Sequence, residues 1–122
     1  MARVKTKEER IRSEKTRLNK QYKELAADKR ALAAGLIEQA AFLRVELADL
    51  AEDIRENGWT EPFQQAKGME PYDRARPQGQ AYQSAVANYQ KIIKILDGLL
   101  PPAAVKPKSD GFDEFVAERD DG

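Results

Sequence analysis

The sequence has 122 residues, with 21 basic and 21 acidic side chains, and it contains neither cysteine nor histidine. Disulfide bonds, thiolate nucleophiles, imidazole bases and Cys/His zinc sites are therefore excluded. No apolar run reaches membrane-spanning length, and the basic start lacks the apolar segment of a signal peptide. We therefore expect a soluble, intracellular protein made of one domain with tails.

Large apolar side chains are scarce for a chain of this length. Leucine, isoleucine, valine and phenylalanine together make 25 residues, whereas alanine alone makes 18. This composition gives a thin core and favours helix. Because subunit contacts bury helix faces that a thin core leaves exposed, the composition predicts self-association.

The net charge of zero is a sum of four blocks of alternating sign. Residues 1–30 carry eleven basic and five acidic side chains, and residues 31–66 carry two and seven. Residues 67–108 carry seven and three, and residues 109–122 carry one and six. One interpretation is a basic arm that meets phosphates and an acidic tail that does not. The alternative is a solvated helix with ordinary ion pairs between neighbouring turns.

A first, basic helix is expected within residues 1–27. Thr6 followed by Glu9 forms a capping-box pattern, and a narrow apolar stripe follows at Ile11, Leu18, Tyr22 and Leu25. We expect a break near residues 26–27 with Asp28 as the cap of the next helix, although one continuous rod is the alternative. The DNA-contacting residues predicted for this helix are Arg10, Arg12, Lys15, Arg17, Lys20 and Lys23.

The second helix has the clearest periodicity in the chain. Its apolar positions alternate spacings of four and three, as in a heptad seam: Leu36, Ala40, Leu43, Leu47, Leu50 and Ile54. Further apolar positions at Ile37, Ala41 and Val45 widen the seam, so the helix is expected to pack against more than one neighbour. Asn57 and Gly58 are expected to end it.

A row of acids follows another face of the second helix. Glu46, Asp49, Asp53 and Glu56 are spaced three and four apart. A carboxylate row of this kind binds a divalent metal only when other oxygen ligands complete the shell, and no companion motif supplies them. Partners for a basic neighbour, or a solvated face, are the favoured interpretations, so no metal or other cofactor is expected.

A third helix is predicted from about Pro77 to Leu100. Proline suits the first helical position, and Pro101 and Pro102 end the helix. Its apolar positions keep the three-four rhythm for five turns. The residues predicted to form a subunit interface on the second and third helices are Leu36, Leu43, Leu47, Leu50, Ile54, Tyr89, Ile92 and Leu96.

Residues 59–76 form an arm between these two helices. The arm is too long for a simple helical turn, so extended pieces or a small hairpin are expected. Its apolar side chains, Trp59, Phe63, Met69 and Tyr72, are expected to pack back on the helices or to reach a neighbouring subunit. The fold class is therefore all-α, with an oligomerisation core at residues 28–102.

Residues 103–122 form an acidic tail that is expected to be disordered in the free protein. Phe112, Phe115 and Val116 are spaced so that a short helix would present them together to a partner. The alternative is an acidic tail that serves only solubility.

Three stretches carry a family resemblance: "GLIEQAAFLRVELADLAEDIRENGW", "EPYDRARPQGQAYQ" and "NYQKIIKILDGLLPP". In this order they resemble the small terminase subunits of tailed double-stranded DNA bacteriophages, particularly those that infect Gram-positive bacteria. The resemblance covers about residues 20–102. Many members carry an acid beside the Arg-Pro pair, whereas Ala75 and Gln78 flank it here, so no salt bridge is assumed at this position.

The resemblance implies a nonenzymatic DNA-packaging factor acting in the host cytoplasm. Small terminases typically assemble into rings, recognise the packaging start on viral DNA and deliver it to a large subunit with ATPase and nuclease activity. The sequence agrees with a role outside catalysis, since it has no GxxxxGK[ST] phosphate loop. By the same resemblance the tail engages the large subunit. A structural coiled-coil assembly protein and a small DNA-binding transcriptional regulator are the two alternatives.

Overall fold

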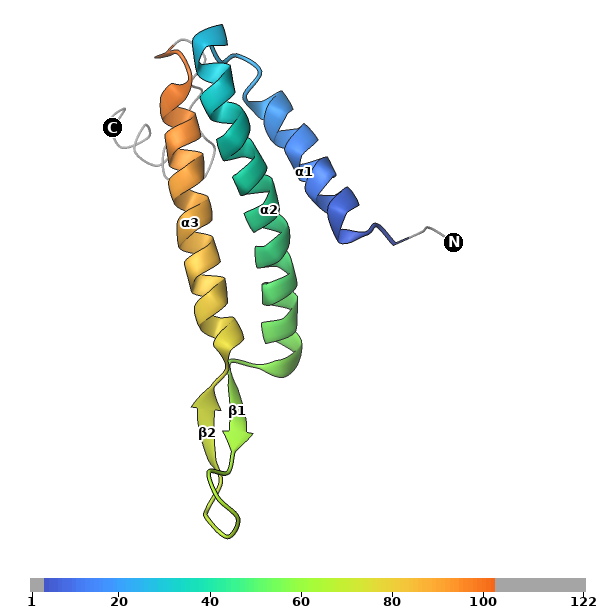
Figure 1. The fold of residues 1–122 in the computed structure, drawn as a ribbon, viewed down its shortest axis with the longest axis vertical. Coiled ribbons are helices and arrows are strands. Elements are labelled where there is room, and N and C mark those ends of the chain that lie inside the picture. Colours follow the sequence, from blue (N-terminus) through green and yellow to red (C-terminus); the bar gives the residue numbers. More distant parts are fainter. Residues whose placement is uncertain (1–3, 103–122) are drawn as a thin grey trace, which may run out of the picture.

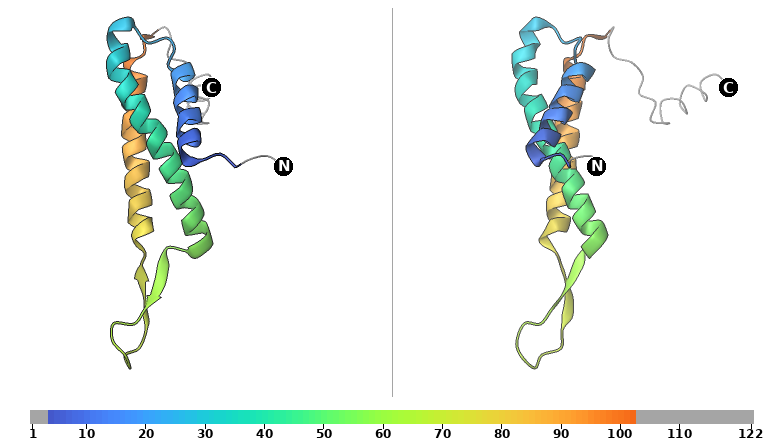
Figure 2. Two further views of the ribbon diagram at one scale, coloured as in Figure 1. Left: turned by 45° about the vertical axis from the view of Figure 1, so that its right-hand side comes forward. Right: turned by 90° about the vertical axis from the view of Figure 1, so that its right-hand side faces the viewer.

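The computed structural model describes residues 4–102. Three helices and one two-stranded antiparallel sheet follow in chain order: α1 (Lys7–Gln21), α2 (Ala27–Asn57), β1 (Thr60–Phe63), β2 (Tyr72–Ala75) and α3 (Pro77–Leu99). Helices α2 and α3 run antiparallel side by side, and α1 lies along α2 from the N-terminal end of α2 to beyond its middle (Figures 1 and 2). The β-hairpin projects from the far end of the α2–α3 pair (Figure 1). The three helices of the predicted all-α fold are confirmed, and the arm between the second and third helices adds a two-stranded sheet. No helix within residues 4–102 is long and apolar enough to cross a membrane.

The start of α1 follows the capping-box prediction. Thr6 Oγ1 accepts a hydrogen bond from the Glu9 amide at 3.1 Å, and Glu9 Oε1 accepts one from the Thr6 amide at 3.4 Å. Each side chain thereby satisfies a backbone donor that has no partner inside the helix.

The break between α1 and α2 is confirmed, but its position corrects the predicted cap. Ala26 occupies the N-cap of α2 without a side-chain hydrogen bond, and Asp28 lies inside the first turn. Tyr22 and Leu25 are both buried, so the segment that connects α1 to α2 packs into the core. Helix α2 therefore begins at Ala27, before the position expected if Asp28 were its N-cap. Asp28 still favours the helix, because a carboxylate in the first turn opposes the positive end of the helix dipole.

The other helix ends follow the backbone signals in the sequence. Helix α2 ends at Asn57, and Gly58 follows with φ of 83°, a conformation that side chains with Cβ atoms rarely adopt. Pro77 occupies the first turn of α3, and α3 ends at Leu99, one residue before the predicted end.

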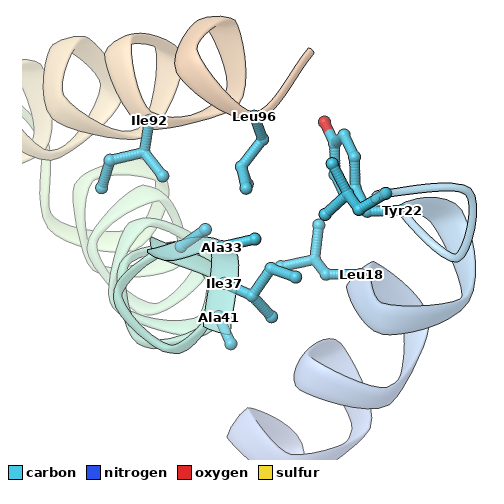
Figure 3. Close-up of a cluster of buried hydrophobic side chains, with 9 residues drawn as sticks. Leu18, Tyr22, Ala33, Ile37, Ala41, Ile92 and Leu96 are labelled. Carbon is cyan, nitrogen blue, oxygen red and sulfur yellow. The ribbon is translucent and has the colours of Figure 1, made fainter. Parts of the chain in front are cut away.

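The core lies where the three helices meet, at the end of the bundle remote from the hairpin. Leu18, Tyr22 and Leu25 come from the α1 side, and Ile92 and Leu96 come from α3 (Figure 3). Helix α2 supplies Ala33, Ile37, Ala40 and Ala41. Small alanine side chains let the neighbouring helices approach, so a chain with few large apolar residues still closes a core. The prediction that α2 packs against more than one neighbour is confirmed, and both neighbours, α1 and α3, belong to the same chain.

The arm at residues 59–76 is the small hairpin considered from the sequence. Its register pairs Thr60 with Ala75 and Phe63 with Tyr72. Phe63 packs edge-on against Tyr72, and the Arg74 guanidinium lies 3.8 Å from the Phe63 ring centroid. The side chains of Met69 and Tyr72 are about half exposed. Of the two expected roles of the arm, packing back on the helices is wrong for this part of the hairpin, because the strands extend beyond α2 and α3 rather than along them (Figure 1). Contact with a neighbouring subunit stays a prediction.

Candidate functional site

Helix α1 is attached to the rest of the chain at both of its ends. At its start, Lys7 pairs with Glu46, and Arg10 Nη1 lies 2.8 Å from Asp49 Oδ1. Just beyond its end, the Tyr22 hydroxyl donates a hydrogen bond of 2.6 Å to Asp97 of α3. Burial, followed by this hydrogen bond, raises the pKa of Tyr22 above its ordinary value. These contacts fix which face of α1 meets the solvent.

The six cations predicted to contact DNA separate into two groups. Arg10 pairs with Asp49, and Arg17 pairs with Glu14 on its own helix and also donates to Gln21. The hydrogen bond to Glu14 raises the pKa of Arg17 above its ordinary value. The remaining four are exposed and form no ion pair within residues 4–102: Arg12, Lys15, Lys20 and Lys23.

Two of the exposed cations lie on the side of α1 that faces away from the core. At 3.6 residues per turn, Arg12 and Lys20 are turned by about 120° and about 160° from the buried Leu18. Lys15 lies nearer the buried face of α1, at about 60° from Leu18 around the helix axis. We name Arg12, Lys15, Lys20 and Lys23 the exposed cation group. Long cationic side chains in this arrangement reach phosphates without requiring a particular base sequence.

The acid row on α2 serves mainly as a set of partners for cations. Glu46 and Asp49 pair with the start of α1, and Asp53 pairs with Arg76. The prediction that these acids meet a basic neighbour is confirmed for three of the four, and Glu56 is exposed. Within residues 4–102 no group of three or more acidic side chains is placed to hold a metal ion.

Arg76 makes the contact that sequence reasoning missed. Its Nη2 lies 3.1 and 3.0 Å from the two carboxylate oxygens of Asp53, and its Nη1 donates to the Gly58 carbonyl at 2.6 Å. The hydrogen bond from Asn57, followed by the contact with Arg76, lowers the pKa of Asp53 below its usual value. Arg76 thus joins the end of α2 to the start of α3 at the base of the hairpin. An ion pair therefore exists at the Arg-Pro stretch, and its acid comes from 23 residues earlier in the chain.

Trp59 anchors the same junction from the hairpin side. The Trp59 ring packs edge-on against Tyr82, with the ring centroids 6.2 Å apart. A Cβ atom placed on Gly79 would lie 3.0 Å from the Trp59 ring, so the missing side chain at this position makes room for it. The sequence shows a glycine in the first turn of the predicted third helix, but it does not show that the Trp59 ring packs against this glycine.

The residues predicted to form a subunit interface are partly used inside the chain. Four are buried in the chain itself: Leu47, Ile54, Ile92 and Leu96. The other four are half-buried: Leu36, Leu43, Leu50 and Tyr89. The seam of α2 therefore serves largely as an intramolecular surface, and its role between subunits stays a prediction.

Different apolar residues remain exposed on the helices. Leu32, Phe42 and Ile95 each keep about half or more of their side-chain surface in solvent, with Phe42 at 50%. Phe42 stands beside a groove of about 640 Å³ between α2 and α3, lined by Glu38, Gln39, Phe42, Leu43, Asn88, Lys91 and Ile92. We name it the α2–α3 groove.

The residues predicted to engage a partner protein, Phe112, Phe115 and Val116, lie outside the described residues. The described part of the chain defines a helical hairpin with a third, cationic helix docked on it and a β-hairpin at its end. Comparisons of the chain with protein-family models, with curated proteins and with solved structures found no match.

Proposed function

We propose that the chain is a DNA-packaging factor, the small terminase subunit of a tailed double-stranded DNA bacteriophage. In this role it binds viral DNA at the packaging start in the host cytoplasm and recruits or stimulates the large subunit with its ATPase and nuclease. The observation that carries the proposal is the exposed cation group, on a helix attached at both ends by Arg10 and Tyr22. The family resemblance of residues 20–102 supplies the specific role.

Pre-positioned cations support DNA binding for a physical reason. Fixing α1 before binding means that little conformational entropy is lost when its face meets a phosphate backbone. Because the cations contact phosphates, affinity should fall steeply with salt and depend little on base sequence.

The test is a salt titration of binding to a fluorescent double-stranded DNA of mixed sequence. The Arg12→Ala/Lys20→Ala variant should bind more weakly, and its plot of log affinity against log salt should be shallower by about two. The matched control, Arg55→Ala/Lys67→Ala, removes the same two residue types at exposed positions on α2 and in the hairpin. An unchanged affinity and slope in the Arg12/Lys20 variant would contradict a DNA-binding role for α1.

The second part of the proposal concerns the motor protein. We expect the full-length chain to stimulate the ATPase of the large subunit and to be captured by it in a pull-down. The Phe112→Ala/Phe115→Ala variant should lose capture while it keeps DNA binding, as expected if the tail is the docking segment. DNA binding without any effect on the motor would favour the transcriptional regulator instead.

The structural assembly protein remains as a second candidate because of one observation. Exposed apolar side chains on α2, α3 and the hairpin are suited to contacts between copies of the chain. Salt-dependent DNA binding separates the two candidates, since an assembly protein does not require it. Self-association into more than two subunits is part of the proposed packaging role and is shared by both candidates.

A further inference from the structure

The α2–α3 groove has apolar and charged parts arranged on two walls. Phe42 and Leu43 come from α2, and Ile92 comes from α3. No residue of α1 lines the groove. The half-exposed Phe42 ring is the largest apolar group at its edge. A half-exposed aromatic beside an apolar groove is typical of a surface that another protein covers.

The two walls carry charges of opposite sign. Glu38 lines the groove from α2, and Lys91 lines it from α3. Both are exposed, and neither forms an ion pair with another residue in the described part of the chain. The two helices run antiparallel (Figure 1). The residues from α2 that line the groove begin at Glu38, and those from α3 end at Lys91 and Ile92, so both charges lie toward the same end of the groove.

We propose that the groove is the contact surface for a second copy of this chain, related by a two-fold axis parallel to α2 and α3. This rotation places the α2 of each copy against the α3 of the other copy. Because the axis is parallel to the helices, it does not shift either copy along them. Glu38 then faces the partner subunit's Lys91, and Lys91 faces the partner subunit's Glu38. Each Phe42 meets the apolar part of the opposite groove. The surface is therefore complementary to itself, as an isologous contact requires.

The alternative arrangements lose this complementarity. A two-fold axis perpendicular to the helices sets each wall against its own copy, so Glu38 and Lys91 do not meet. The acidic segment at residues 109–122, with six acids and one base, is another possible occupant of the groove. It would be attracted by Lys91 but repelled by Glu38, which carries a like charge. The second copy pairs both charges, and it does so twice.

This inference rests on the self-association in the proposed function and names one surface that carries it. An isologous contact closes at two subunits, so an assembly of more than two needs another contact. The exposed apolar side chains of the hairpin, Trp59, Met69 and Tyr72, provide a separate surface for that contact.

A charge swap tests the inference on the full-length chain, with native mass spectrometry and sedimentation equilibrium at micromolar concentration. Glu38→Lys and Lys91→Glu should each raise the dissociation constant of the two-fold contact about tenfold or more, because each places like charges opposite each other twice. The combined variant Glu38→Lys/Lys91→Glu restores both pairs with reversed polarity, so it should recover association close to that of the original protein.

Two controls make the result specific. Lys94→Glu changes the same charge one turn further along α3, where Lys94 lines a different groove shared with α1, and it should leave association unchanged. Phe112→Ala/Phe115→Ala should also leave it unchanged. Circular dichroism with thermal melts establishes that each variant is folded.

Single reversals that leave association unchanged, or a combined variant that fails to recover it, would overturn the proposed surface. Loss of association in the Phe112/Phe115 variant would assign the groove to the tail of a neighbouring copy and would overturn the two-fold contact through Glu38 and Lys91. Either failure leaves the DNA-binding test of α1 intact, because that test measures affinity for DNA and its salt dependence.

Discussion

The hydrogen bond from Tyr22 to Asp97 gives a direct test of how α1 is attached. The Tyr22→Phe substitution removes one hydroxyl and keeps the buried ring, which is only 2% exposed. The bond is 2.6 Å long and its acceptor is a carboxylate, and such bonds contribute about 1.5–3 kcal/mol. Asp97 is only half-buried, so water partly replaces the lost donor and the lower figure applies. We expect a loss of about 1.5 kcal/mol, and therefore a melting temperature lower by about 6–12 °C.

The burial of Tyr22, followed by its bond to Asp97, predicts a dependence on alkaline pH. The folded-state pKa of Tyr22 is raised above the value near 10 of an unfolded chain, so the hydroxyl form is favoured by folding. Its contribution to the free energy of unfolding is complete below about pH 10 and is lost as the pH rises toward the folded-state pKa. The difference in melting temperature between the original protein and Tyr22→Phe should therefore shrink above about pH 10.

Tyr82→Phe is the matched control, because it removes the same hydroxyl from a half-buried tyrosine on α3 that packs against Trp59. Thermal melts of the three proteins by circular dichroism, across neutral and alkaline pH, provide the measurement. Equal melting temperatures for Tyr22→Phe and Tyr82→Phe would refute the assignment of stability to the Tyr22–Asp97 bond.

Two further predictions concern the hairpin junction and the seam of α2. Arg76→Gln should loosen the hairpin, and the fluorescence of Trp59, the only tryptophan in the chain, should report it. The pKa of Asp53 is lowered, so its contribution to stability is present above the usual carboxyl pKa near 4 and is lost as the pH falls through the folded-state value. Acid should therefore produce the same change in Trp59 fluorescence. Identical fluorescence spectra for the original protein and Arg76→Gln would exclude Arg76 as the anchor. Leu47→Asp should lower the melting temperature of the chain itself, because Leu47 is 7% exposed and an unpaired carboxylate there is costly to bury, whereas Leu43→Asp, at a half-buried position, should be tolerated better. A folded Leu47→Asp chain with an unchanged melting temperature would contradict a role for Leu47 in the core of the chain itself, and the predicted role of Leu47 in a subunit interface would then be favoured.

The helix boundaries are the part of the fold that the sequence predicts well, because their causes are local. Thr6 and Glu9 satisfy each other's backbone donors within one turn. Gly58 and Pro77 act through their own backbone preferences, so no distant partner is needed. The position of Asp28 shows the limit of such reasoning, since burial of Leu25 moved the start of α2.

Contacts between distant residues were not predictable in the same way. The Arg76–Asp53 pair joins residues 23 positions apart, and only the antiparallel path of α2 and α3 brings them together. Likewise, the periodicity of α2 identifies apolar faces without identifying their partners. A face that packs against α1 or α3 of the same chain produces the same pattern as a face that packs against another subunit.

The ion pairs also change what the charge blocks mean for DNA binding. From the excess of cations in residues 1–30, the sequence predicts a basic arm with six DNA-contacting cations on the first helix. In the structure Lys7 and Arg10 pair with acids of α2 and so position the helix, whereas Arg17 pairs with Glu14 of the same helix. If the chain binds DNA as proposed, the exposed cation group can supply four contacts, which predicts a slope of log affinity against log salt of about −3.6 per chain for duplex DNA. Six contacts would give about −5.4, so a measured slope near that value would mean that DNA displaces Arg10 and Arg17 from their acids and that α1 is rearranged on binding.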